Sequence, residues 1–68
     1  MHHDIMGQTA PEDIDMLTKI IEAYEHLGIV STLDRHRGIV IIRGTEDTAA
    51  ELEIILANLP FPFTMITG

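Results

Sequence analysis

The chain has 68 residues and a formal net charge of −7, from 4 Lys and Arg against 11 Asp and Glu, and 46% of its residues are hydrophobic. This length fits one domain, residues 1–68, and the apolar fraction is too high for a disordered acidic tail. Because the chain has no Cys, disulfides and thiolate metal sites are excluded. No apolar run approaches a membrane span or resembles a signal peptide, so we expect a soluble, cytoplasmic protein.

The N-terminal part predicts a strand followed by a helix. Residues 1–7 are expected to form a short first strand, and residues 11–27 a helix whose N-cap is Thr9, with Glu12 completing a capping box. Gly28 is placed where a left-handed residue ends a helix. The apolar residues recur at helical spacing and are expected to lie in the core: Ile14, Leu17, Ile20, Ile21, Tyr24 and Leu27.

The next segment predicts a β-hairpin. Residues 29–34 and 39–43 are rich in β-branched residues and are joined by a four-residue turn. Gly38 can take the positive φ that a type I turn with a bulge requires. The Asp34 carboxylate is expected to accept hydrogen bonds from N–H groups of the turn.

A second helix and a last strand complete the fold. Thr45 is the expected helix cap, two prolines end the helix region, and residues 63–66 are the expected last strand. The order strand–helix–strand–strand–helix–strand predicts an α+β ferredoxin-like sandwich with both helices on one face of an antiparallel sheet. The buried stripe of the second helix is expected to comprise Ala49, Leu52, Ile55, Leu56 and Leu59.

Both faces of the hairpin are mostly apolar, but two helices can cover only one face of the sheet. One face holds Ile29, Leu33, Ile39 and Ile41, and the other holds Val30, Thr32, Val40 and Ile42. We assign the second set to an oligomer interface and expect another copy of the chain to cover it, as a homodimer or a larger assembly. The alternative is a terminal segment folded across the face.

Few residues suggest chemistry. No Ser–His–Asp order, glycine-rich phosphate loop or HExxH motif occurs, so we expect no enzyme activity and no cofactor. Met1-His2-His3 has the spacing of an amino-terminal Cu(II) or Ni(II) chelate, but we interpret it as a solvated tail, and no metal site is assigned. His26 is interpreted as a favourable cation at a helix end. Few aromatic residues accompany the few basic ones, which argues against nucleic-acid binding, and no membrane contact is expected.

Two segments are candidate binding sites. Gly7, Gln8 and Thr9 precede the first helix and can hold a carboxylate or phosphate of a small anionic ligand, unless Thr9 only caps its own helix. Arg35, His36 and Arg37 form a basic hairpin tip that can meet an acidic partner, unless they are simply a solvated turn.

The helix sequence Ile20-Ile21-Glu22-Ala23-Tyr24-Glu25, followed by 27–34 and 38–40, resembles a family of short bacterial proteins catalogued only as a domain of unknown function. The resemblance covers about residues 12–44 and implies no activity. The expected topology is also similar to that of ACT-type regulatory domains, which pair through their sheets and bind amino acids near their first loop. Their usual Pro-Gly at the start of the first helix is missing here.

The function expected from these observations is that of a non-catalytic homo-oligomeric module in regulation or protein interaction. The alternatives are an ACT-like sensor of an amino acid or anionic metabolite, and an adaptor that binds an acidic partner through residues 35–37.

Overall fold

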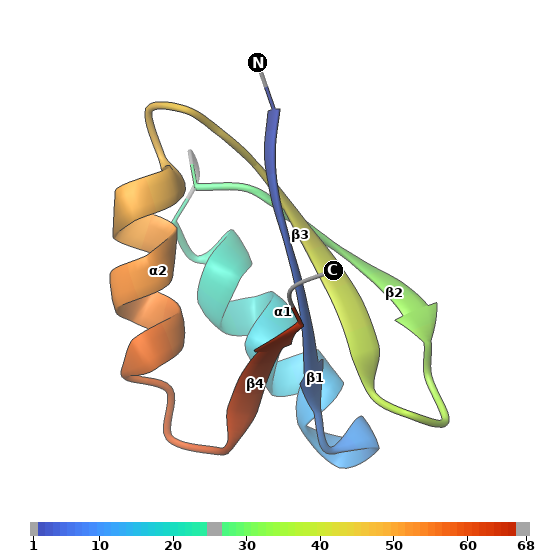
Figure 1. Ribbon diagram of the computed structural model, residues 1–68. Helices are drawn as coiled ribbons and strands as arrows, with labels where there is room; N and C mark the ends of the chain where they lie inside the picture. The colour runs from blue at the N-terminus through green and yellow to red at the C-terminus, as the bar shows by residue number, and fades with distance from the viewer. Residues whose placement is uncertain (1, 25–26, 67–68) are drawn as a thin grey trace.

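The computed structural model describes residues 2–24 and 27–66, with side chains from Asp4 onward. A four-stranded sheet of order β2-β3-β1-β4, antiparallel between all neighbours, packs against two helices (Figure 1). This confirms the predicted ferredoxin-like α+β fold. The elements in chain order are β1 (His2–Thr9), a 3-10 turn η1 (Pro11–Asp13), α1 (Ile14–Glu22), β2 (Ile29–Asp34), β3 (Ile39–Thr45), α2 (Ala49–Ala57) and β4 (Phe63–Ile66).

The hydrophobic core lies between the helices and one face of the sheet. From the sheet, Val40 and Ile42 of β3 enter it with no exposed surface. Ile5, Val30 and Phe63 pack at its edge from the other strands. From the helices and the following turn it receives Ile14, Leu17, Ile21, Leu27, Leu52 and Leu56.

The assignment of an oligomer interface to Val30, Thr32, Val40 and Ile42 is therefore wrong for Val40 and Ile42, because the helices cover them completely. Val30 packs against the same core, and Thr32 stays exposed at the edge of this face. The two faces of the hairpin are similar in hydrophobicity, so the hairpin alone does not tell which one the helices take. The side is decided by the right-handed crossover from β1 through α1 to β2, together with the strand order. The open face is the one with Ile39 and Ile41.

The first helix differs from the prediction at both ends. β1 continues to Thr9, and Ala10 is the N-cap of η1, so Thr9 does not cap the helix. The helix ends at Glu22, and the Leu27 N–H donates to the Tyr24 carbonyl in a turn that returns Leu27 to the core. Tyr24, predicted to be in the core, is 44% exposed because the helix has ended before it. The predicted helix-end role of His26 lies outside the described residues.

Of the two glycines expected to have a positive φ, only one has it. Gly38, with φ 69°, has the only positive φ among the described residues and closes the β2–β3 turn as predicted. Gly28, expected to be left-handed, is not. The Asp34 carboxylate accepts the Arg37 N–H at 3.2 Å, which confirms its predicted role in the turn.

The second half of the chain follows the prediction closely. The α2 stripe is confirmed, with Leu52 and Leu56 buried and the other members half-buried. Its N-cap is Thr48 rather than Thr45, because Thr45 ends β3 and its N–H donates to the Thr48 hydroxyl at 3.0 Å. β2 and β4 have the predicted bounds.

Candidate interaction surface

The side of the sheet that faces away from the helices carries a continuous apolar surface, here called the outer face. The strand registers arrange its side chains in three rows across the strands. The middle row is Ser31, Ile41, Met6 and Ile66. The row toward the end of β3 is Ile29, Arg43 and Asp4. The row toward the β2–β3 turn is Ile39, Gln8 and Thr64, and on β2 a β-bulge places Leu33 and Asp34 together opposite Ile39.

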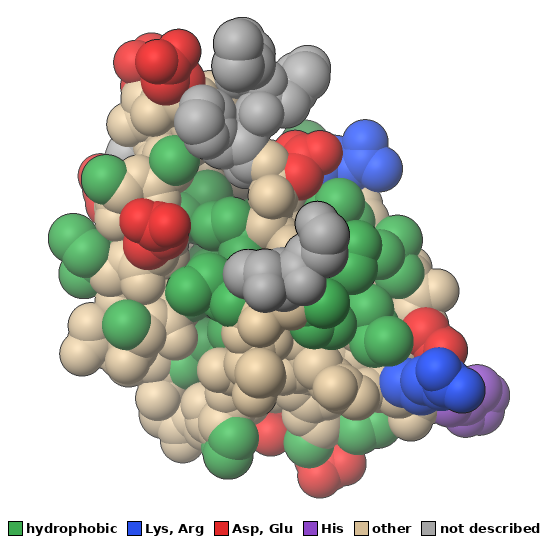
Figure 2. Space-filling view, viewed as in Figure 1, with side chains coloured by type: hydrophobic (Ala, Val, Ile, Leu, Met, Phe, Trp, Pro, Cys, Tyr) green, Lys and Arg blue, Asp and Glu red, His purple; other side chains and the backbone are tan. Residues whose placement is uncertain are grey.

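The outer face is open to solvent. Ile29 is 65% and Leu33 52% exposed, Met6 and Ile66 are also exposed, and Ile39 and Ile41 are half-buried. Figure 2 looks onto this face and shows hydrophobic side chains gathered over the sheet, with charged side chains toward its borders. The described parts of both termini are β1 and β4, which lie in the sheet and do not cross it. Scattered apolar side chains are normal on a protein surface, but a contiguous patch indicates an interaction site.

The sequence pattern found only part of this surface. It placed Ile29, Leu33, Ile39 and Ile41 together on one face. The register confirms this for Ile29, Ile39 and Ile41, whereas Leu33 lies at a β-bulge opposite Ile39, which the alternation did not predict. It missed Met6 and Ile66, because their contribution depends on β1 lying beside β3 and on β4 lying beside β1. The signal that could have found Met6 is the alternation Asp4, Met6, Gln8 in the first strand.

A hollow of about 320 Å³ lies at one end of the outer face, lined by Asp4, Ile29, Arg43, Gly44 and Thr45. Asp4 and Arg43 are cross-strand partners in the β1–β3 register, so opposite charges stand next to each other here. Ile29 supplies an apolar wall. The hollow therefore offers room for an apolar side chain beside a locally neutral pair of charges.

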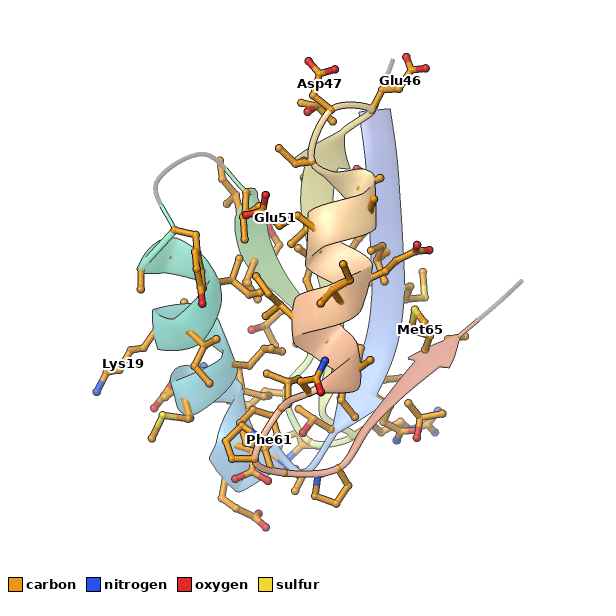
Figure 3. The ribbon with its side chains drawn as sticks, turned by 90° about the vertical axis from the view of Figure 1, so that its left-hand side faces the viewer. Lys19, Glu46, Asp47, Glu51, Phe61 and Met65 are labelled. Atoms are coloured by element: carbon orange, nitrogen blue, oxygen red, sulfur yellow. The ribbon has the colours of Figure 1, made fainter. Side chains whose placement is uncertain are left out.

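Charge is distributed unevenly between the two layers of the molecule. Arg35, Arg37 and Arg43 lie in the sheet or its hairpin with the acidic residues Asp4 and Asp34. Eight further acidic residues in the described part of the chain, together with Lys19, belong to the two helices and the segments next to them. Figure 3 shows Glu46 and Asp47 together at the beginning of α2, at the opposite end of that helix from Phe61. The outer face is thus close to neutral, while the helical side carries almost all of the negative charge.

The anion site predicted at Gly7, Gln8 and Thr9 does not have the donors it relied on. These residues belong to β1, where the Thr9 N–H donates to the Gly38 carbonyl at 2.9 Å. The Thr9 hydroxyl donates to the Pro62 carbonyl at 2.9 Å, and the Gln8 amide donates to the Arg37 carbonyl at 2.8 Å. The segment joins β1 to its neighbours and is not a loop that could hold a ligand.

Gly7 is required for a close approach. A Cβ atom at this position would overlap the ring of Phe63, which packs directly over the strand on the inner face. An aromatic ring laid over a glycine of a neighbouring strand fixes register, because no other residue leaves room for it. The structure therefore gives Gly7 a packing role.

The basic tip of the hairpin is well exposed. Arg35, His36 and Arg37 are all on the surface, and the Arg37 guanidinium lies 3.8 Å from the Asp34 carboxylate in an exposed ion pair. Such pairs contribute little to stability. Binding of an acidic partner by this tip stays a prediction.

Two further features were searched for in the described residues. No group of three or more His, Asp or Glu side chains is placed to hold a metal ion among them. The side chains of His2 and His3, and all of Met1, lie outside this search. No helix in residues 2–24 and 27–66 has the length and hydrophobicity needed to span a membrane.

Comparison with known proteins gives a family but no activity. The model of a family described as a domain of unknown function (DUF4911) matches residues 8–62, and the chain belongs to this family. This confirms the expectation, drawn from residues 12–44, of membership in a family of unknown function. No curated protein and no solved structure matches the chain.

Proposed function

We propose that this DUF4911 domain is a non-catalytic, cytoplasmic module for regulation or protein interaction, and that it associates with copies of itself through the outer face of its sheet. The observation that carries the proposal is the exposure of Ile29 and Leu33, at 65% and 52%, beside Met6, Ile41 and Ile66 on one continuous surface. Burial of apolar surface yields about 25 cal/mol per Å², so covering this face strongly favours association.

The size of the face suits a small dimer interface. The four strands have 8, 6, 7 and 4 residues, which at about 3.3 Å per residue and about 4.8 Å between strands gives a flat area of about 400 Å² before side-chain relief is counted. Stable interfaces bury about 600 Å² or more on each partner. The flat area alone is below that figure, so we expect a small and weak dimer.

Charge favours a second copy as the occupant. The outer face is close to neutral because Arg43 stands beside Asp4, so two copies can meet there without strong repulsion. The acidic helices of both copies then point away from the contact. Any contact that brought two helical sides together would juxtapose like charges, which destabilises an interface.

A matched pair of substitutions tests the proposal. Ile29 on the outer face and Ile54 on α2 are the same residue type with nearly equal exposure, 65% and 64%. We expect Ile29→Lys to weaken self-association by about tenfold or more, because a charge is placed in an apolar contact, whereas Ile54→Lys leaves it unchanged. Sedimentation equilibrium of the wild-type chain and both variants measures the dissociation constants. A wild-type chain that remains monomeric at several hundred micromolar would refute the proposal.

A further inference from the structure

The outer face carries a protruding side chain at one end of β2 and a hollow at the other. We propose that two copies pack outer face on outer face with their strands running in opposite directions, so that Leu33 of each copy enters the hollow beside Ile29 of the other. This inference rests on the proposed function and specifies its geometry.

The protrusion is Leu33. In the β2–β3 register Thr32 pairs with Val40 and Asp34 pairs with Ile39, so Leu33 is the extra residue of a β-bulge. A bulge redirects the side chain that it inserts and bends the strand. Leu33, the next-to-last residue of the edge strand β2, is 52% exposed. A large apolar side chain displayed in this way fits a recess on a partner.

The recess is the hollow lined by Asp4, Ile29, Arg43, Gly44 and Thr45. Its volume of about 320 Å³ admits a leucine side chain, and Ile29 provides the apolar contact. The charges at its rim, Asp4 and Arg43, are neighbours across the β1–β3 pair and compensate each other. An apolar side chain that enters therefore meets a rim with no net charge.

Twofold symmetry brings the two features together. Ser31 lies midway between Ile29 and Leu33, which are about 13 Å apart at the usual rise of a strand. A twofold axis that runs along the middle row, perpendicular to the strands, places the row of Ile29 in one copy over the row of Leu33 in the other. The partner's Leu33 then lies over Ile29, while Ile41 and Met6 face the same residues of the partner. Ser31, small and half-buried, allows the β2 strands to approach closely.

Charge selects this orientation over one in which the strands run in the same direction. The hairpin tip with Arg35 and Arg37 lies at one end of β3, and Glu46 and Asp47 follow its other end. When the strands of the two copies run in opposite directions, the basic tip of each copy lies at the end of the partner that carries Glu46 and Asp47. Strands running in the same direction place the two basic tips at the same end of the dimer, and they leave Leu33 away from the hollow.

Cysteine cross-linking tests the orientation, because the chain has no Cys of its own. The variants Leu33→Cys, Ile29→Cys and Met6→Cys each replace an exposed apolar residue by a smaller, weakly hydrophobic one, and sedimentation checks that each variant still associates. A short bismaleimide is added to each variant alone and to an equimolar mixture of Leu33→Cys and Ile29→Cys. Sedimentation of the unmodified chain is measured in parallel.

We expect the mixture to form covalent dimers in more than fivefold higher yield than Leu33→Cys or Ile29→Cys alone, and Met6→Cys to cross-link with itself. A dimeric wild type in which Leu33→Cys cross-links alone as well as in the mixture overturns the orientation but not the proposed function. If the mixture cross-links but Met6→Cys does not, the two copies pair through the edges of their β2 strands, because β1 lies two strands away from that edge. This outcome also overturns the inference. A monomeric wild type overturns both proposals.

Discussion

The two faces of β3 have almost the same composition, but one is fully buried and the other is partly exposed. Val40 and Ile42 have no exposed surface, whereas Ile39 and Ile41, their immediate neighbours, are only half-buried. The difference comes from the layer above each face: α1 and α2 cover the first pair, and no described helix or strand covers the second. Hydrophobic residues on both faces of a strand therefore did not tell which face the chain buries itself, and the face left open is the one to which we assign the proposed self-association.

The largest expected effect comes from placing a charge on one face of β3 or on the other. Ile42→Lys places an unpaired charge in the core, and its cost of several kcal/mol is comparable with the whole stability of about 3–10 kcal/mol expected for 68 residues. We expect this variant to be unfolded by circular dichroism, while Ile41→Lys on the outer face keeps its fold and loses self-association. A folded Ile42→Lys variant would show that the two faces have been assigned the wrong way round.

An intermediate effect is expected at the seam between β1 and β4. Gly7→Ala introduces a Cβ that overlaps the Phe63 ring, and overpacking of this kind costs about 1–3 kcal/mol. Urea denaturation of Gly7→Ala, Phe63→Leu and the double variant measures the coupling. We expect Gly7→Ala to be less damaging in the Phe63→Leu background; strictly additive effects would mean that the ring does not rest on this glycine.

The smallest effect is expected at Thr9. Thr9→Val keeps the shape of the side chain but removes its hydrogen bond to the Pro62 carbonyl, at a cost of about 1 kcal/mol in the free energy of unfolding. Thr64→Val, an exposed Thr on the outer face, is the control and should change stability by less than about 0.5 kcal/mol. Equal effects in thermal denaturation would contradict the view that Thr9 is a structural link of the inner face.

Much of the fold could be predicted because the signals are local. The alternation of 29–34 and 39–43, the helical spacing of Leu52 and Leu56, and the turn chemistry of Asp34 and Gly38 all depend on residues near in sequence. Thr9 and Thr45 were placed wrongly for the opposite reason. Both residues have the chemistry of helix caps, but β1 and β3 extend over them because each strand finds partners far away in the chain.

The sequence predicted that an apolar interaction surface exists, but it did not identify the residues that form this surface. The proposal of a partner followed from the number of apolar residues in the hairpin, but the choice of residues depended on which side the helices take. The pairing of β1 with β3 and with β4 placed Met6 between Ile41 and Ile66, and it placed Asp4 opposite Arg43.

By itself, the amino-acid sequence determined the order of the elements, the members of each apolar stripe and the excess of hydrophobic residues in the hairpin. These properties are encoded by period, turn chemistry and composition. Only the tertiary structure decided which face is the core and which is left open, because both faces satisfy the same alternation. The direction of the crossover and the register between strands that are far apart in the sequence decide which face the helices cover.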